Sequence, residues 1–228
     1  MEKPNIQVDI PEAYRYMGGC GAPDETVAAE LRRAAELIER AVSPRSISRV
    51  CGIERSAGLS LSETGLSLTG KTVAALLHDC ESCVIFCATA GSGIESLLRS
   101  WQLRSLAFAA MLDACASSAV EALCSAVETA LRADFSRRGL YLTDRFSPGY
   151  GDLPIAIQPA FCAALDTTRK IGVSVGENGI MIPRKSVTAL IGVSKNPQKH
   201  YDTGCFGCLS ADSCKFRANG VSCYGQLI

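Results

Sequence analysis

The alanine-rich stretch from Leu106 to Phe135 constrains the fold of this chain more than any other segment. It reads LAFAAMLDACASSAVEALCSAVETALRADF and carries charge only at Asp113, Glu121, Glu128, Arg132 and Asp134. Alanine has the highest intrinsic helix propensity, so the stretch predicts one long helix. A membrane span needs about 20 predominantly apolar residues, and two acids interrupt this stretch. We therefore expect a helix of a globular protein rather than a membrane span.

The acids on this helix are the first candidate functional residues. Glu121 and Glu128 are seven residues apart, which places them about 20° apart around a helix axis. An acid that is buried alone is costly, so at least one of the two is expected to meet a cation or a hydrogen-bond donor. The alternative, which the residues alone favour, is that the acids mark the one solvated stripe of a mostly buried helix.

Helices and strands are mixed along the rest of the chain. Residues 24–42, DETVAAELRRAAELIERAV, predict an amphipathic helix that ends before Pro44. The other expected elements are a hairpin or half-buried strand over 57–69, a short helix over 71–78, a buried strand over 83–89, a helix over 158–165, and strands over 171–175, 179–183 and 186–193. This order neither alternates strictly nor separates the two kinds of element, so it predicts an α+β fold.

The charge balance limits the classes of partner. The chain has 23 basic and 23 acidic residues in 228, which gives a formal net charge of zero. Such a chain is a poor candidate for nonspecific binding to nucleic acid or to an anionic membrane surface. Its first residues, MEKPNIQVDIPEAYRYMGG, contain no apolar segment of a secretory signal. We expect a cytoplasmic protein with no nucleic-acid or membrane partner.

Cysteine is the unusual component, with 12 residues in 228. In a reducing compartment these thiols are expected to be buried, catalytic or bound to metal rather than paired in disulfides. Four of them lie in a polar tail, residues 196–228, which we expect to be separate from a domain over 1–195: Cys205, Cys208, Cys214 and Cys223. Their spacing predicts a metal site for zinc or an iron–sulfur cluster, with a reactive thiol group or a coincidental cluster as the alternatives. We interpret Cys80, Cys83 and Cys87 as packing residues, with redox chemistry as the alternative.

Two turns carry residues suited to ligands. Gly91 and Gly93 follow the expected buried strand and precede a helical pattern, so their backbone would let a phosphate or nucleotide approach. A tight strand-to-helix turn explains these glycines equally well. The segment RFSPGYGDLP, residues 145–154, contains two prolines and two glycines, which fix a specific loop. Arg145 offers a planar fork for a carboxylate and Tyr150 offers a ring and a hydroxyl, although a structural turn with a surface arginine fits the same residues.

Several kinds of site are absent from the sequence. The chain has two histidines, His78 and His200, which excludes multi-histidine metal catalysis. It contains no Asp-X-His-X-X-Gly, the usual motif for the lower ligand of a cobalamin. Serine-hydrolase and Walker signatures are absent as well.

At RFSPGYGDLP the sequence resembles the activation domain of cobalamin-dependent methionine synthase, in its free-standing bacterial form. Further segments carry the resemblance in the expected order: EAYRYMG at 12–18, ATAGSG at 88–93, LDACASSAVE at 112–121 and MIPRKSVTALIG at 181–192. Together they extend over about residues 10–195. The resemblance implies a curved mixed or antiparallel sheet flanked by helices.

The same resemblance implies S-adenosylmethionine (AdoMet) binding and a role in reductive reactivation. In that family, cob(II)alamin accepts an electron from a flavodoxin- or ferredoxin-like donor, and AdoMet then supplies the methyl group that restores methylcobalamin. Carried over residue by residue, Arg145 would grip the AdoMet carboxylate and Glu121 would face AdoMet. Gly149 and Tyr150 would shape the loop between AdoMet and the corrin, which makes Tyr150 the residue expected at the reacting centre.

The resemblance also implies that a partner carries the cobalamin, either a methionine synthase core or another corrinoid protein. The modules for homocysteine, folate and cobalamin are not in this sequence. The chain departs from the family motif after Tyr150, where Gly151-Asp152-Leu153-Pro154 stands in place of Pro-Ala-Cys-Pro. Two alternatives stay open: an iron–sulfur protein that delivers electrons to corrinoid proteins, and a docking module without chemistry of its own.

Overall fold

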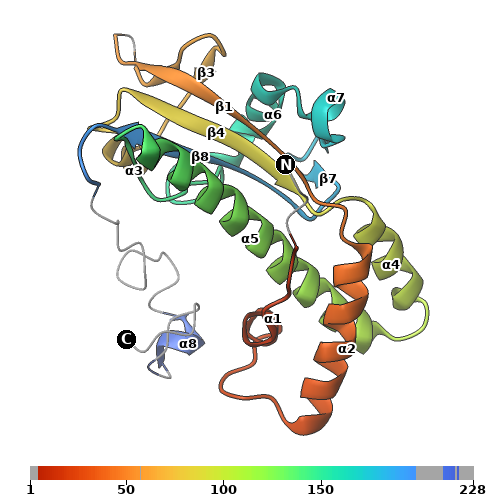
Figure 1. The fold of residues 1–228 in the computed structure, drawn as a ribbon. Coiled ribbons are helices and arrows are strands. Elements are labelled where there is room, and N and C mark those ends of the chain that lie inside the picture. Colours follow the sequence, from red (N-terminus) through yellow and green to blue (C-terminus); the bar gives the residue numbers. More distant parts are fainter. Residues whose placement is uncertain (1–4, 57, 199–212, 219, 221–228) are drawn as a thin grey trace. The chain divides into compact units, whose positions relative to one another are not determined.

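The structure, a computed structural model, describes residues 5–56, 58–198, 213–218 and 220 (Figure 1). The chain divides into two compact units. Unit 1 comprises Met1–Ser43, Ala90–Leu123 and Asp202–Ile228, and unit 2 comprises Pro44–Thr89 and Cys124–Tyr201. The separate tail expected over 196–228 stays a prediction, because most of it lies outside the described residues.

Unit 1 is helical in its described residues. It contains α1 (Ile10–Tyr16), α2 (Glu25–Ala41), α4 (Gly93–Gln102), the first part of α5 (Leu106–Arg137) and α8 (Lys215–Ala218). The helix expected over 24–42 is confirmed as α2. The Asp24 side chain accepts a hydrogen bond from the Val27 N–H at 2.9 Å and so caps this helix. The apolar face of α2 is buried at Leu31, Ala34, Ala35 and Ile38.

Unit 2 is built around a six-stranded antiparallel sheet. Its strands, in the order in which they pair, are β3 (Leu66–Ser67), β2 (Ser60–Leu61), β1 (Arg45–Glu54), β4 (Ser82–Thr89), β8 (Ser186–Ser194) and β5 (Tyr141–Leu142). The central strand β4 pairs with β1 on one side and with β8 on the other along its whole length. β6 (Ser174–Val175) and β7 (Met181–Ile182) form a separate two-stranded sheet. The α+β class and the antiparallel sheet flanked by helices are confirmed.

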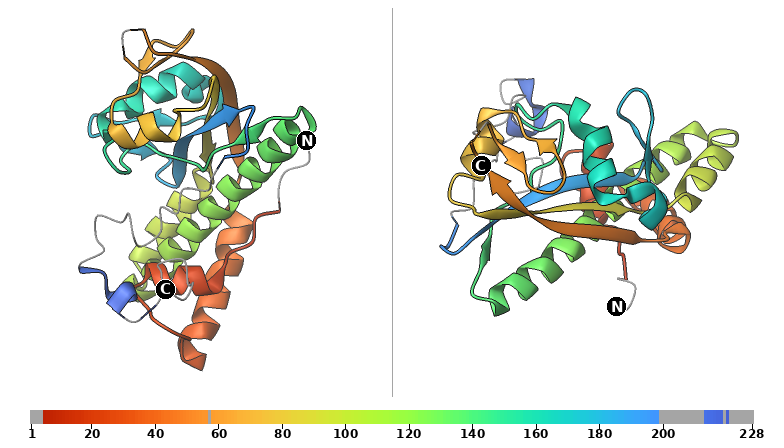
Figure 2. Two further views of the ribbon diagram at one scale, coloured as in Figure 1. Left: turned by 90° about the vertical axis from the view of Figure 1, so that its left-hand side faces the viewer. Right: turned by 90° about the horizontal axis from the view of Figure 1, so that it is seen from above.

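Helices lie on both faces of this sheet (Figure 2). α6 (Gln158–Leu165) and α7 (Thr167–Ile171) cover one face, and the part of α5 that belongs to unit 2 lies on the other. Two short helices complete the unit, α3 (Lys71–Leu76) and the 3-10 helix η1 (Ile155–Ile157). The helices expected over 71–78 and 158–165 are thus confirmed as α3 and α6.

The strand expected over 171–175 is wrong at its start, because Ile171 is the last residue of α7. Gly172 ends that helix with a φ of 70°, the left-handed conformation that glycine adopts at low cost after a helix. The strand is therefore shortened to Ser174–Val175.

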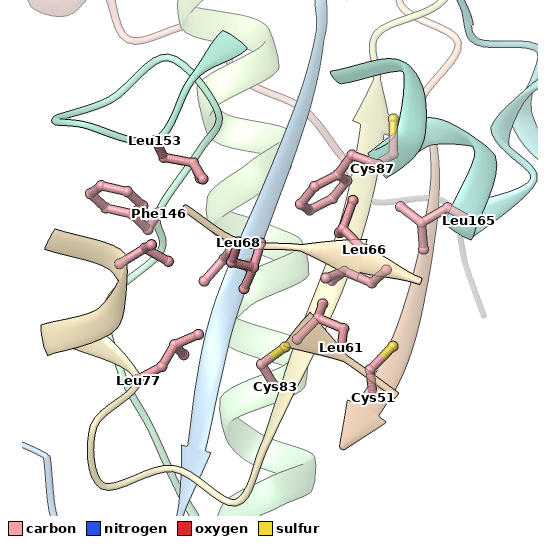
Figure 3. Close-up of a cluster of buried hydrophobic side chains, with 14 of the residues drawn as sticks. Cys51, Leu61, Leu66, Leu68, Leu77, Cys83, Cys87, Phe146, Leu153 and Leu165 are labelled. Carbon is pink, nitrogen blue, oxygen red and sulfur yellow. The ribbon is translucent and has the colours of Figure 1, made fainter. Parts of the chain in front are cut away.

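The core of unit 2 is a cluster of buried apolar side chains on the face of the sheet that α6 covers (Figure 3). Seven of the eight residues of β4 are buried, which confirms the buried strand expected over 83–89. Cys51, Cys80, Cys83 and Cys87 belong to this cluster and are at most 3% exposed. Burial raises the pKa of Cys80 to about 11 and raises that of Cys83 as well. Both thiols therefore stay protonated near neutral pH and behave as packing residues.

The long helix expected over 106–135 is confirmed as α5. Within the described residues it is the one helix long and apolar enough to cross a membrane, and 56% of its apolar segment is buried inside the protein. Its fully buried residues include Leu112, Cys115, Ala116, Ala119 and Cys124. This is the burial of a core helix.

Candidate functional site

The segment Arg145–Pro154 follows β5 and leads into η1, and both of its ends are anchored in the core of unit 2. The Phe146 N–H donates to Leu190 O at 2.9 Å, and the Leu190 N–H donates to Phe146 O at 2.8 Å. The side chains of Phe146 and Leu153 point into the hydrophobic cluster and are 8% and 1% exposed (Figure 3). The residues between these anchors therefore form a loop whose two ends are fixed.

Between the anchors the backbone forms a closed turn that exposes Tyr150. The Gly149 N–H donates to Leu153 O at 2.8 Å, and the Tyr150 N–H donates to Ser147 O at 3.1 Å. Gly149 has a φ of 91° and Gly151 a φ of 51°, values that glycine adopts with the least strain. The Tyr150 side chain is 62% exposed. The loop thus presents a ring and a hydroxyl on a backbone held by its own hydrogen bonds.

Asp152 lies in the Arg145–Pro154 loop and contacts the first residues of α3. Its carboxylate accepts hydrogen bonds from the Lys71 and Thr72 N–H groups at 2.5 and 3.0 Å. These residues begin α3, whose cap position is Gly70 and therefore has no side chain to accept them. The hydrogen bonds from Thr72 and Lys71 lower the pKa of Asp152 below its ordinary value of 3.8. Asp152 therefore fastens the loop to α3.

We predict that Asp152→Ala lowers the thermal stability of the protein at about pH 7, because two helix N–H groups lose their acceptor. Since the folded-state pKa of Asp152 is lowered from its ordinary value of 3.8, its contribution to stability is present above that ordinary value and is lost as the pH falls through the folded-state value. We expect thermal unfolding at a series of pH values to show that the difference in unfolding temperature between wild type and Asp152→Ala becomes smaller below about pH 4.

The control for this prediction is Asp113→Ala, which removes an exposed aspartate from unit 1. It should change the unfolding temperature little. If the difference in unfolding temperature between wild type and Asp152→Ala is the same in acid as at neutral pH, the charge of the carboxylate does not contribute to the capping of α3.

Arg145 lies beside the first anchor of the loop. Its side chain is half-buried, and its Nη1 atom is shielded from solvent. A guanidinium stays charged at any physiological pH and offers parallel N–H donors to a carboxylate. Partial burial lowers the effective dielectric, so an ion pair here is stronger than one on an open surface. A guanidinium in this setting can bind a carboxylate through two parallel hydrogen bonds.

Arg132, on the part of α5 that belongs to unit 2, holds the backbone just before Arg145. Its guanidinium donates to Leu142 O at 2.9 Å and to Thr143 O at 2.7 Å. It also pairs with the Glu128 carboxylate at 2.7 Å. The expectation that one of the two helix acids meets a cation is confirmed for Glu128. Sequence reasoning gave Arg132 no role, although its spacing of four residues from Glu128 is that of a helical ion pair.

The structure places Arg145, Gly149 and Tyr150 on one loop of unit 2, whereas Glu121 belongs to unit 1. Glu121 is half-buried on α5, and Asp113 on the same helix is exposed. The exposure of Asp113 agrees with a solvated stripe. The role of Glu121 facing AdoMet stays a prediction.

The metal site predicted in the tail lies mostly beyond the residues that the structure describes. Cys205, Cys208 and Cys223 are outside them, and Cys214 is partly exposed. Among the described residues, no group of three or more histidine, cysteine, aspartate or glutamate side chains is arranged to hold a metal ion. The zinc or iron–sulfur site in the tail stays a prediction.

The glycines of the segment ATAGSG have a packing explanation within unit 1. A Cβ atom at Gly91 would lie 2.9 Å from Ser43 O, and one at Gly93 would lie 2.7 Å from Ala41 O. The Ser43 N–H also donates to Ala90 O at 2.9 Å. The end of α2 and the residues after it approach this turn so closely that a larger residue would force the backbone apart. This observation favours the tight turn over the phosphate-binding alternative.

No protein-family model and no curated protein sequence matches this chain. Among solved structures, a crystal structure of the MetH reactivation domain bound to AdoHcy is similar, with a TM-score of 0.60 and 16% sequence identity. The match covers 85% of this chain and 76% of that one. The two chains share a fold.

Proposed function

We propose that this chain binds AdoMet and is an activation subunit for the reductive remethylation of cob(II)alamin on a separate cobalamin-dependent methionine synthase or a related corrinoid protein. The observation that carries the proposal is the fold shared, over 85% of this chain, with a reactivation domain solved with AdoHcy. AdoHcy is AdoMet without the transferred methyl group, so a site for one is suited to the other.

Arg145 is the residue that would bind the carboxylate of AdoMet, through two parallel hydrogen bonds from its guanidinium. Gly149 and Tyr150 would form the wall of the site that faces the corrin. Tyr150, with 62% of its side chain exposed, would be covered when a corrin-carrying partner docks. Glu121 would balance the positive charge of the ammonium or sulfonium group of the ligand.

In this proposal the role of the chain is to position the methyl group of AdoMet. AdoMet supplies the methyl group when it is bound, and no side chain of the protein needs to form a covalent bond. The loop is already fixed by the Phe146–Leu190 hydrogen bonds and by Asp152 on α3. Because this backbone is ordered in advance, little conformational entropy is lost on binding and the methyl group is held in one direction.

The cobalamin and the electron would come from partners. This chain contains no Asp-X-His-X-X-Gly motif for a lower cobalamin ligand. We therefore propose a methionine synthase core or another corrinoid protein as the docking partner, and a flavodoxin- or ferredoxin-like protein as the electron donor.

Calorimetric titration of AdoMet and of AdoHcy into the full chain tests the proposal. We expect saturable binding by the wild type and at least about 100-fold weaker binding by Arg145→Ala, because two charge-assisted hydrogen bonds of about 1.5–3 kcal/mol each are lost. Arg145→Lys should lie between the two, since lysine keeps the charge but not the fork.

The matched control is Arg137→Ala, which removes an arginine that is 78% exposed and paired only with a surface acid in the described contacts. It should bind AdoMet as the wild type does. A folded wild-type protein that binds neither AdoMet nor AdoHcy, or an Arg145→Ala variant with unchanged affinity, would contradict the proposed site.

A further inference from the structure

β1 has a long edge that no other strand of unit 2 covers (Figure 1). On its inner side, β1 pairs with β4 at every residue from Arg45 to Gly52. On its outer side, β2 pairs only with the last two residues of β1, Ile53 and Glu54. In the part of the chain that the structure describes, the outer side of residues 45–51 therefore has no strand paired with it.

A hydrogen bond near the end of β1 shows which of its backbone groups point outward. Gly52 O accepts from the Ser62 N–H at 2.9 Å, on the side away from β4. Alternate residues of an antiparallel strand direct their N–H and C=O groups to the same edge. The register with β4 has no bulge, so Ser46, Ser48 and Val50 also point outward. No hydrogen bond to their backbone groups is found among the described residues.

This edge lacks the features that usually keep an edge strand from pairing with another chain. The strands at the two margins of the sheet, β3 and β5, are protected by being only two residues long. The open edge of β1 is longer and contains no proline, lysine or bulge. Its two arginines are held at the helices: Arg49 Nη1 donates to Ala164 O at 3.2 Å, and a Cβ atom at Gly172 would lie 3.3 Å from Arg45 Nη1. The edge is therefore open to a further strand.

The residues of this edge are complementary to themselves in one antiparallel register. If two copies of β1 pair with their two-fold axis at Ser48, Ser46 of one copy lies opposite Val50 of the other. All the outward N–H and C=O groups then join in about six hydrogen bonds. An axis at Ile47 or at Arg49 would instead place arginine directly opposite arginine, and like charges in that position destabilise a sheet.

A shift of the axis by two residues brings in backbone groups that cannot pair. With the axis at Ser46, the pairing would use Pro44, which has no N–H. With the axis at Val50, it would use Gly52, whose C=O already accepts a hydrogen bond. Only the axis at Ser48 satisfies every outward group and opposes no like charges.

We propose that β1 pairs with β1 of a second copy of this chain, antiparallel and with the two-fold axis at Ser48, so that two six-stranded sheets become one continuous sheet. An interface made by one pair of strands belongs to the class of weak, transient interfaces, which bury less than about 1,200 Å². The dimer therefore forms reversibly and depends on protein concentration. This inference does not depend on AdoMet binding, because it rests on β1 alone.

Sedimentation velocity of the full chain, from low micromolar to submillimolar concentration, tests the proposal. We expect the average mass of the wild type to rise with concentration from that of one chain toward that of two. Ser48→Pro should associate at least about tenfold more weakly, because the pair loses the N–H groups at its centre. The variant should keep its fold, since the Ser48 N–H points away from β4 and proline is tolerated at such positions of an edge strand.

Two control variants accompany Ser48→Pro. Ser48→Thr keeps the N–H group and adds a β-branched side chain, so it should dimerise at least as strongly as the wild type. Leu103→Ser removes an apolar side chain of unit 1 that is 91% exposed, and it should leave the association unchanged.

Hydrogen exchange of the wild type gives a second readout that needs no variant. As the protein concentration is raised through the dimerisation range, the amides of Ser46, Ser48 and Val50 should exchange about tenfold more slowly. The amide of Arg49, which points toward β4, should change little. A wild type that stays monomeric would overturn the proposal and would leave a strand of another protein as the occupant of this edge. A dimer whose outward amides are not protected, or one that Ser48→Pro leaves intact, would also overturn it.

Discussion

Gly192→Ala should lower the free energy of unfolding by about 3 kcal/mol, because the added methyl group overpacks a filled core. A Cβ atom at Gly192 would lie 2.5 Å from Cys80 Sγ and 2.9 Å from both Leu77 Cδ2 and Thr143 Cγ2. Leu77 and Cys80 are 0% and 2% exposed, so neither side chain can move into solvent. For a chain of this size the loss corresponds to a fall in Tm of about 6–12 °C.

Gly192 is small because three segments meet at this point of β8. It lies opposite Cys83 in the register with β4. On the other side of β8, the Gly192 N–H donates to Thr143 Oγ1 at 2.8 Å, and the Thr143 N–H donates to Gly192 O at 3.0 Å. The close approach therefore ties the end of the sheet to the residues that lead into the Arg145 loop.

Two further variants test this explanation of the clash. Gly176→Ala is the matched control, since a Cβ atom there would meet only Ile180 O at an ordinary 3.6 Å, and its Tm should change little. Cys80→Ala removes the nearest atom, so the double variant Gly192→Ala/Cys80→Ala should be more stable than the sum of the two single changes by about 1 kcal/mol. Strict additivity would show that the lost stability has another cause.

The helices and strands that could be predicted from the sequence are those in which the spacing of apolar residues follows a regular pattern. α2 has an apolar stripe that ends in a capped turn, and β4 has a continuous apolar run that is buried on both faces. β1 has neither feature. Of its ten residues, from Arg45 to Glu54, only Cys51 is buried, so hydrogen bonds to β4 rather than a hydrophobic period define this strand. Such pairing is invisible in a sequence.

In the candidate site, too, the residue types predict some features, and contacts between distant residues determine the others. Two prolines and two glycines in residues 145–154 predict a fixed loop, and Arg145 is recognisable there by its residue type. The contacts that fix the loop join positions far apart in the sequence. Asp152 caps α3 at a separation of 81 residues, and Phe146 pairs with Leu190 in β8. The spacing of residues within one segment carries no information about either contact.

Arg132→Ala should have the second large effect, a loss of about 2–3 kcal/mol in the free energy of unfolding. The guanidinium donates to two backbone carbonyls, Leu142 O and Thr143 O, and pairs with Glu128. Removing it leaves these acceptors and a carboxylate that is 23% exposed without their main donor, and a hydrogen bond to a charged group contributes about 1.5–3 kcal/mol. Arg137→Ala, on the same helix but 78% exposed, should change stability by at most about 0.5 kcal/mol.

A second readout distinguishes positioning from stability alone. Leu142 and Thr143 lie three and two residues before Arg145, so the loss of Arg132 should loosen the backbone that positions the guanidinium of Arg145. At a temperature where the variant is fully folded, we expect Arg132→Ala to bind AdoMet about tenfold more weakly, on the basis of the proposed function and of about 1.4 kcal/mol in binding free energy. Arg132→Lys should recover part of the stability but little of the affinity, because an ammonium cannot bridge both carbonyls and Glu128 in one plane. If Arg132→Ala is destabilised but binds AdoMet with unchanged affinity, Arg132 stabilises the contact between α5 and β5 and does not position Arg145.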